Sequence, residues 1–223
     1  MSIVLAEDAD WLFLNKPAGL PIFPPHGDPE GPSLLAALLE DRPEQAAQPW
    51  DEGFEGGLVH RLDTWTSGLV LAARSPAALR TARQLFAGGL LRKQYLFLTD
   101  RKVAWERSVV EWPLAHARKD RRKMVWQRGQ ATPHRGRWFP ARTVLRRIGK
   151  RGPLGLWCAT ITTGVTHQIR VHAAAVGLAL VGDKLYGGTS RGPDGRFFLH
   201  AERIEGWPVP PPVVPSPSDW PVR

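Results

Sequence analysis

Short apolar runs separated by polar or Gly/Pro-rich turns recur along this 223-residue chain. Residues 3–5 and 11–14 are apolar and flank an acidic turn, a pattern that predicts a β-hairpin. Further strand-like segments lie at 57–62, 69–73 and 94–99, and a strand pair is expected at 142–148 and 154–163 across the turn at 149–153.

Three segments carry the signals of helix ends. Ser33 is the predicted N-cap of a short helix with leucines on one face. Ser75 and Pro76 have the residue types that favour the N-cap and first position of a second helix. Thr166 is the expected N-cap of a third helix, which Gly177 would close. Strands therefore dominate with a few helices between them, which predicts an α+β fold with a largely antiparallel sheet.

Two segments lack such patterns. Residues 113–140 are basic and are expected to be irregular. The tail from residue 206 holds seven prolines and is expected to be extended or disordered. We therefore expect one domain at 1–205, long enough to enclose an active site, followed by a Pro-rich tail at 206–223.

Several protein classes are disfavoured by composition. No apolar run reaches the roughly 18–20 residues of a membrane span, and the N-terminus lacks the basic region of a leader peptide. Cys158 is the single cysteine, so no internal disulfide can form, and we expect a cytoplasmic protein. His167 and His172 fall on different helix faces, and neither a metal-binding motif nor a phosphate-binding glycine loop is present. No metal or organic cofactor is predicted.

The net charge of +9 is concentrated in one segment. Residues 101–151 contain 16 Lys or Arg and three acidic residues, a local balance of +13, whereas the rest of the chain has a balance of −4. Such a patch favours a polyanionic partner, and nucleic acid is the usual one. A solvated surface in an Arg-rich protein remains the alternative.

Three residues could carry chemistry. Asp63 lies in a predicted turn after an apolar segment, where it is either a catalytic carboxylate or a simple turn residue. Arg170 could reach inward from the third helix and hold Asp63 ionised, or could point to solvent. Tyr95 is either a core residue or a ring that stacks on a nucleobase.

Taken together, these segments are similar to those of a known enzyme family. The chain contains, in order, Asn15-Lys16-Pro17-Ala18-Gly19-Leu20, His60-Arg61-Leu62-Asp63-x-x-Thr66-Ser67-Gly68-Leu69, Lys93-x-Tyr95, Thr163-Gly164-x-Thr166-His167-Gln168-Ile169-Arg170-Val171-His172, Gly182-Asp183-x-x-Tyr186-Gly187 and Leu199-His200-Ala201. Their order and spacing resemble those of the RluA-type pseudouridine synthases. The chain departs from the family pattern at Val165, where arginine is usual, and at Trp65, where a polar residue is usual.

The resemblance implies a central mixed, mostly antiparallel sheet flanked by helices, with an active-site cleft between its halves and no cofactor. It implies isomerisation of a uridine in structured transfer or ribosomal RNA, after the base has flipped out. It assigns catalysis to Asp63, Tyr95 and Arg170, and substrate binding to Arg61, His60, Thr66, Lys93, His167 and Gln168. The N-terminal S4-like domain common in the family is expected to be absent, and we expect a monomer.

Three other functions stay open. A non-catalytic RNA-binding or folding factor would explain the basic segment equally well, but would not need Asp63 near phosphates. A hydrolase would need a second carboxylate or a metal near Asp63, and no such set is visible in the sequence. A protein-interaction module would explain the Pro-rich tail but none of the motifs.

Overall fold

The chain divides into two compact units. A computed structural model describes residues 2–189 and 196–220. Unit 1 comprises Met1–Leu91 and His200–Pro217, and unit 2 comprises Arg92–Leu199 and Ser218–Arg223. Each unit contains strands, at least one helix and buried apolar clusters of its own.

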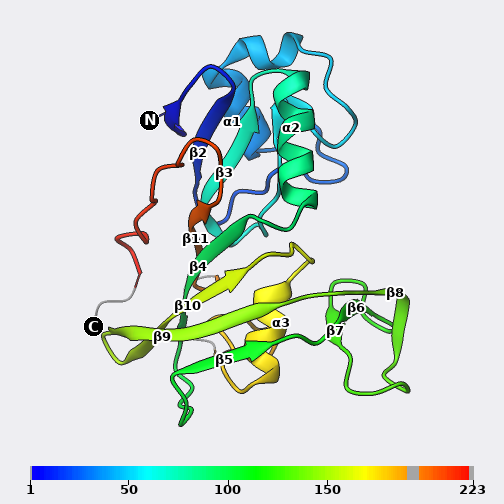
Figure 1. The fold of residues 1–223 in the computed structure, drawn as a ribbon, viewed down its shortest axis with the longest axis vertical. Helices are drawn as coiled ribbons and strands as arrows, with labels where there is room; N and C mark the ends of the chain where they lie inside the picture. Colours follow the sequence, from blue (N-terminus) through cyan, green and yellow to red (C-terminus); the bar gives the residue numbers. More distant parts are fainter. Residues whose placement is uncertain (1, 190–195, 221–223) are drawn as a thin grey trace. The chain divides into compact units, whose positions relative to one another are not determined.

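The strands of unit 1 follow the order β1-β2-β3-β11 (Figure 1). β1 (Val4–Glu7) and β2 (Trp11–Lys16) form the predicted hairpin, and β2 also pairs antiparallel with β3 (Ser67–Ala73). β3 pairs in parallel with β11 (Leu199–Glu205). Every residue of β3 is buried, which is why its sequence is an unbroken run of apolar and small residues.

Two α-helices of unit 1 begin where the sequence predicts. The Oγ of Ser33 accepts a hydrogen bond from the backbone N–H of the third residue of α1 (Leu34–Asp41), and Ser75 does the same for α2 (Pro76–Ala87). α2 runs alongside β3 (Figure 1) and turns its small and apolar side chains towards the core.

One predicted strand of unit 1 is wrong. Residues 57–62 are not a strand: the short 3₁₀ helix η2 (Glu55–Gly57) occupies their start, and the segment contributes only an isolated bridge from Leu58 to Ala72. A second 3₁₀ helix, η1 (Pro43–Ala47), follows α1. An apolar run can be buried as extended loop as well as strand, and periodicity alone does not separate the two.

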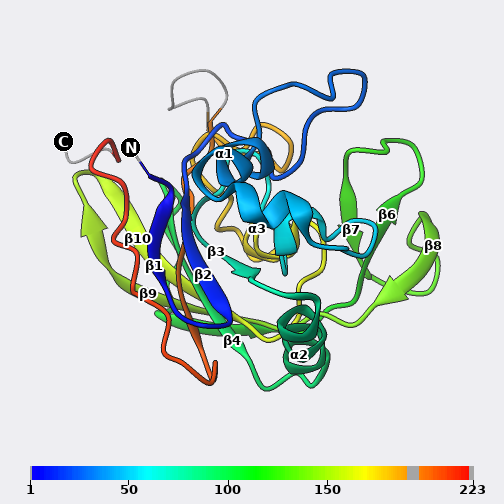
Figure 2. The same cartoon turned by 90° about the horizontal axis from the view of Figure 1, so that it is seen from above.

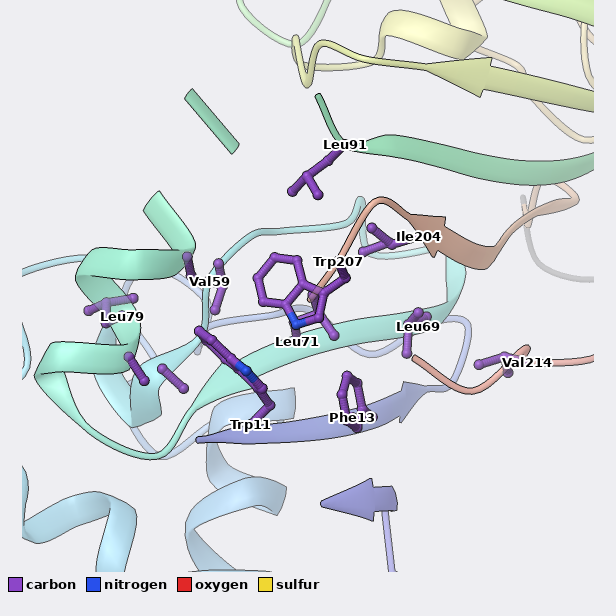
Figure 3. Close-up of a cluster of buried hydrophobic side chains, with 13 residues drawn as sticks. Trp11, Phe13, Val59, Leu69, Leu71, Leu79, Leu91, Ile204, Trp207 and Val214 are labelled. Carbon is purple, nitrogen blue, oxygen red and sulfur yellow. The ribbon is translucent and has the colours of Figure 1, made fainter. Parts of the chain in front are cut away.

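The core of unit 1 includes side chains from the Pro-rich segment (Figure 3). The indole rings of Trp11 and Trp207 meet edge to face with their centroids 4.8 Å apart. Val214 is buried as well, and its N–H donates to the carbonyl of Glu202 at 2.9 Å. Residues 206–220 form no helix or strand, yet they supply buried apolar side chains.

The larger set of strands in unit 2 follows the order β4-β10-β9-β5, and its strands pair antiparallel. These strands are β4 (Arg92–Thr99), β10 (Leu154–Ile161), β9 (Thr143–Arg151) and β5 (Arg107–Val110). The predicted pair at 142–148 and 154–163 is confirmed as β9 and β10. A buried cluster on this sheet joins Leu96, Leu98, Cys158 and Phe198 to Trp220.

The segment expected to be irregular at 113–140 instead forms a second sheet, in the order β7-β6-β8. Its strands are β6 (Leu114–Ala117), β7 (Met124–Trp126) and β8 (His134–Phe139). Figure 2 shows this sheet set apart from β9 and β10 of the same unit. Its few apolar residues, among them Leu114 and Met124, pack against Val171 of a helix. Packing against residues distant in the sequence therefore stabilises strands that the charged local sequence does not predict.

That helix is α3 (Gln168–Ala175), and its start differs from the expectation. His167, in the left-handed conformation with φ 55°, occupies the N-cap position that the sequence suggested for Thr166. A non-glycine residue in this conformation is uncommon and cannot be read from the sequence. The helix ends at Ala175, and Gly177 follows with φ 83°, in agreement with its predicted role as terminator.

The α+β fold with a mixed, mostly antiparallel central sheet is confirmed. The pair β3–β11 is parallel, whereas the other strand pairs given above are antiparallel. Within residues 2–189 and 196–220, no helix has the length and apolarity needed to cross a lipid bilayer.

Candidate active site

Asp63 lies in a tight turn directly before β3. The N–H of Thr66 donates to the carbonyl of Asp63 at 3.0 Å and closes the turn. The side chains of Thr66 and Ser67 are buried, whereas that of Asp63 is partly exposed. A buried strand thus presents the carboxylate from a short, anchored loop.

Lys16, the last residue of β2, is hydrogen-bonded to the backbone of this turn. Its ammonium is fully buried and donates to three carbonyl oxygens, those of Pro17 at 2.9 Å, Leu20 at 2.7 Å and Thr64 at 2.9 Å. An ammonium has three N–H donors, so these three acceptors match its capacity. The bond to Thr64 ties the opening motif of the chain to the residue that follows Asp63.

The buried charge of Lys16 also interacts with Asp63. Burial lowers the pKa of Lys16 from 10.5 to about 7, and the negative charge of Asp63 acts in the opposite direction. This role of Lys16 was not expected from the motif alone. A signal was present, because Lys16 follows a run of apolar strand residues and has the inward parity of that strand, and a lysine can be buried only when its donors are satisfied.

Gly19 makes the second contact between the opening motif and the turn. Its N–H donates to the carbonyl of Thr64 at 2.9 Å. A Cβ atom on Gly19 would lie 3.0 Å from the ring of Trp65, and its φ is +88°. Trp65, which departs from the family pattern, therefore packs against the neighbouring loop at a point where glycine leaves room for its ring.

The motif Leu199-His200-Ala201 contacts the start of β3 through the side chain of His200. The Oγ of Ser67 lies 2.9 Å from Nδ1 of buried His200, and Nε2 of His200 lies 2.9 Å from the carbonyl of Val214. A carbonyl can only accept, so Nε2 carries the proton and Ser67 donates to Nδ1. Burial lowers the pKa of His200, which favours this neutral form.

Gly68 allows β3 and β11 to approach each other. Its φ is +110°, and a Cβ atom at this position would lie 2.1 Å from the carbonyl oxygen of Ala201. The parallel pairing of Gly68 with Ala201 is therefore possible only without a side chain. This glycine holds the strand that follows the Asp63 turn in its register.

His60 and Arg61 precede the turn. The Nε2 of His60 accepts a hydrogen bond from the N–H of Leu71 at 3.2 Å, and its ring lies 5.4 Å from that of Phe86. His60 is thus fastened to β3, whereas Arg61 is exposed.

Arg170 lies on α3 in unit 2 and forms a buried two-point ion pair with Asp183. Its Nε and Nη2 donate to the two carboxylate oxygens at 2.7 and 2.9 Å. The guanidinium carbon also lies 4.1 Å from the ring centroid of Phe197 and 5.1 Å from that of Tyr186. These contacts hold the guanidinium in one orientation. The sequence analysis quoted Asp183 in a motif but did not assign it this role.

Tyr95 and Lys93 lie on β4 and are both buried. Tyr95 pairs with Ala159 of β10. The ammonium of Lys93 reaches the motif at residues 163–172, because a Cβ atom on Gly164 would lie 2.9 Å from its Nζ. Burial lowers the pKa of Lys93 from 10.5 to about 8.

Gln168 is bonded on both sides of its amide group. Its Nε2 donates to the carbonyl of Arg142 at 2.9 Å and to Oγ1 of Thr143 at 3.1 Å. Its Oε1 accepts from Oγ1 of Thr163 at 2.8 Å and from the N–H of Val165 at 3.2 Å. The side chain thereby joins the motif at residues 163–172 to the start of β9.

Tyr186 connects His167 to the second sheet. Its hydroxyl accepts from the N–H of Met124 at 2.8 Å and is hydrogen-bonded to Nδ1 of His167 at 2.8 Å. Val165 packs in the same cluster as Met124 and Tyr186, so this chain has an apolar contact where the family pattern has arginine.

The predicted site residues fall into two groups. His60, Arg61, Asp63 and Thr66 belong to unit 1, together with Lys16. Lys93, Tyr95, His167, Gln168 and Arg170 belong to unit 2, together with Asp183. The pairing of Arg170 with Asp63, which the sequence analysis expected, stays a prediction.

Known proteins are similar to this chain over most of its length. A family model described as RNA pseudouridylate synthase matches residues 10–175. A "Ribosomal large subunit pseudouridine synthase D" of Nitrosomonas europaea is 36% identical over 209 residues, which cover 92% of this chain and 56% of that protein. The protein of the same name from Escherichia coli is 33% identical over 194 residues, with 86% and 54% covered.

Solved structures are similar as well. "Human RNA Pseudouridylate Synthase Domain Containing 1" aligns with a TM-score of 0.72 and 26% identity, over 90% of this chain and 76% of that one. The chain spans little more than half the length of the curated relatives named above.

Proposed function

Because the chain belongs to the RNA pseudouridylate synthase family, we propose that it isomerises a uridine of structured RNA to pseudouridine, with Asp63 as the catalytic carboxylate. The observation that carries the proposal is the anchoring of the Asp63 turn. The carbonyl of Thr64 accepts from both Lys16 and Gly19, so the carboxylate is presented from a loop with little freedom to move.

The target base must first leave its stack. Flipping a nucleotide out of a helix requires a few kcal/mol, and stacking on an aromatic ring can offset a similar amount. We assign this stacking to Tyr95. Arg61 is exposed and cationic, which suits contact with a phosphate next to the flipped nucleotide.

Asp63 then opens the glycosidic bond by one of two routes. The carboxylate either attacks the nucleotide or removes a proton from its ribose, and the bond between C1′ and N1 breaks. The detached base turns and forms a bond from C5 to C1′, while the bond to Asp63 breaks or, on the other route, the proton returns to the ribose. The proton on C5 leaves to Tyr95 or, through water, to Asp63, and N1 takes up one proton from the solvent. One glycosidic bond breaks and one forms, so the isomerisation needs no oxidant or reductant.

The remaining site residues are assigned by their contacts. We assign to Arg170, whose guanidinium Asp183 holds in place, the role of partner of the Asp63 carboxylate. Lys93 and His167 are substrate-binding groups, whereas the bonds of Gln168 and His60 to their own unit suit residues that position the motifs. Thr66 closes the Asp63 turn.

The RNA that carries the target uridine is transfer or ribosomal RNA. The names of the relatives refer to the large ribosomal subunit, and we propose its RNA as the first candidate. Pseudouridine mapping by carbodiimide-stopped primer extension, in cells with and without the gene, distinguishes the two.

Release of tritium from RNA labelled at uridine C5 tests the chemistry. The unchanged protein should release tritium, and Asp63→Asn should release none above background. Glu52→Gln, which removes an exposed carboxylate outside the motifs, is the matched control and should leave the rate unchanged. A near-normal rate for Asp63→Asn would rule out the assignment. Binding of RNA without tritium release by the unchanged protein would favour a non-catalytic RNA-binding factor.

A further inference from the structure

Two tryptophans are stacked beside the three-stranded sheet of unit 2. The rings of Trp112, just before β6, and Trp126, at the end of β7, have centroids 4.5 Å apart and planes inclined by 24°. Trp126 is partly buried and packs on the cluster that contains Leu114, Met124 and Val171. Trp112 is the more exposed ring, with 36% of its surface accessible. The stack therefore leads from the core of unit 2 to solvent.

A hydrogen bond from α3 holds the backbone of Trp112. The Nε2 of His172 donates to the carbonyl oxygen of Trp112 at 2.9 Å. Its Nδ1 lies 2.8 Å from Oγ1 of Thr143, and the histidine is completely buried. The backbone of Trp112 is thus held by α3, and its ring is stacked on Trp126, which packs on the core, so the stack exists before any ligand arrives. Such preorganisation lowers the entropic penalty of binding.

The surroundings of the stack are strongly cationic. Residues 111–139 contain eight Lys or Arg and two acidic residues. Both acids are ion-paired, Glu111 with Arg142 at 2.8 Å and Asp120 with Arg122 at 3.2 Å. Little negative charge is left to repel a polyanion, and several of the basic side chains, including Arg121 and Arg128, are exposed.

One of these cations lies directly over the stack. The guanidinium carbon of Arg128 is 5.1 Å from the ring centroid of Trp126. An aromatic surface next to a guanidinium matches a nucleotide, because a base can stack on the ring while the cation contacts its phosphate. A folded protein partner would need an apolar surface without such an excess of one charge.

We propose that Trp112, Trp126 and Arg128, hereafter the tryptophan face, bind an unpaired base of the substrate RNA other than the target uridine. Regular duplex has no free base surface, so the tryptophan face recognises a loop or bulge of the substrate RNA. The inference rests on the proposed function, which makes RNA the substrate. It adds a second base-binding site, separate in sequence from Asp63 and Tyr95, that favours RNA with an unpaired loop.

Binding measured by fluorescence anisotropy tests the tryptophan face. The assay is run in an Asp63→Asn background, so that the RNA is not modified, with a labelled hairpin that has an unpaired loop and a blunt duplex of the same stem. Trp112→Leu should bind the hairpin about 5- to 100-fold more weakly, and Trp112→Phe should restore most of the loss. Binding of the blunt duplex should be the same for all three proteins.

The salt dependence separates stacking from charge. Trp112→Leu should leave the slope of log affinity against log salt unchanged, whereas Arg121→Gln should weaken hairpin and duplex alike and reduce that slope by about 1. Trp105→Leu is the matched control, because this tryptophan packs against Trp157 outside the three-stranded sheet. It should bind both RNAs as the unchanged protein does.

Three results would overturn the inference. One is equal hairpin affinity for Trp112→Leu and the unchanged protein, and another is an equal loss for hairpin and duplex. The third is a change of molecular mass in solution on Trp112→Leu without a change in RNA affinity, which would show that the tryptophan face joins copies of the chain. A protein that binds the hairpin through Trp112 but releases no tritium would instead contradict the proposed function alone.

Discussion

The carbonyl oxygen of Thr64 accepts a hydrogen bond from the ammonium of Lys16 at 2.9 Å, so the residue next to Asp63 is held by the end of β2. The same ammonium satisfies the carbonyls of Pro17 and Leu20. One buried charge thus joins the opening loop and the catalytic turn, and its removal should disturb both.

Lys16→Met is expected to destabilise the protein and to slow the reaction. Methionine fills a similar volume but leaves three carbonyl oxygens without a donor in a buried place, which should lower the free energy of unfolding by roughly 3 kcal/mol. Urea unfolding measures the stability, and tritium release from the folded variant measures the rate. Lys184→Met, at an exposed lysine, should change the stability little. Equal stability of the two variants would contradict the role of Lys16.

The buried lysines should make stability depend on pH in the alkaline range. Burial depresses the pKa of Lys16 to about 7 and that of Lys93 to about 8 in the folded protein, from 10.5. Between these values and 10.5 the unfolded chain binds more protons, so the free energy of unfolding rises with pH, by on the order of 1 kcal/mol per unit and group. Below pH 7 both lysines are protonated in the folded and in the unfolded chain, so neither makes the free energy of unfolding depend on pH.

Single substitutions separate the two contributions in urea unfolding measured from pH 6 to 10. Lys16→Met should flatten the rise from about pH 7 upward, and Lys93→Met only from about pH 8 upward. Identical pH profiles for both variants and the unchanged protein would show that neither ammonium is held in a buried environment.

Gly68→Ala should prevent the normal pairing of β3 with β11. The new Cβ would lie 2.1 Å from the carbonyl of Ala201, in a backbone region that disfavours side chains. We expect a fall in the thermal midpoint of at least about 10 °C, which corresponds to several kcal/mol for a chain of this size. Gly53→Ala is the control, because Gly53 also has a positive φ but no atom within 4 Å of its Cβ position. A similar midpoint for both variants would refute the steric argument.

Asp183→Asn should weaken both the fold and the reaction, because it leaves the buried guanidinium of Arg170 without its counter-charge. Breaking a buried ion pair from one side typically costs about 3–5 kcal/mol. Tritium release should fall as well, and a variant that stays folded but reacts normally would show that Asp183 does not position Arg170. Asp120→Asn breaks a two-point pair with Arg122 on the surface and should leave the thermal midpoint unchanged.

The elements that the sequence predicts correctly are those with local signals. Ser33 and Ser75 cap their helices with their own side chains, and the β1–β2 hairpin follows from apolar runs around a turn. The second sheet of unit 2 was missed because Leu114 and Met124 are isolated among charged residues and become core only when they meet Val171. Such contacts between distant segments leave no periodic pattern in the chain.

In the candidate site, too, the residues with local motifs could be predicted from the sequence, whereas their contacts with distant residues could not. The motif strings identify Asp63, Tyr95 and Arg170 as the residues to examine, but they do not reveal the partners that hold them. Neither the three carbonyls around Lys16 nor the pairing of Arg170 with Asp183 can be read from spacing, because each joins residues brought together by the fold. The left-handed His167 likewise depends on local packing that shifts the start of α3 by one residue.

Residues of the Pro-rich segment belong to buried clusters of both units. Trp207 and Val214 lie in the cluster of unit 1, and Trp220 lies in one of the clusters of unit 2. These two clusters therefore stay incomplete on the ribosome while the segment is still inside the exit tunnel. A premature stop before residue 207 would release a polypeptide without these side chains, which chaperones and proteases would recognise by its exposed apolar surface.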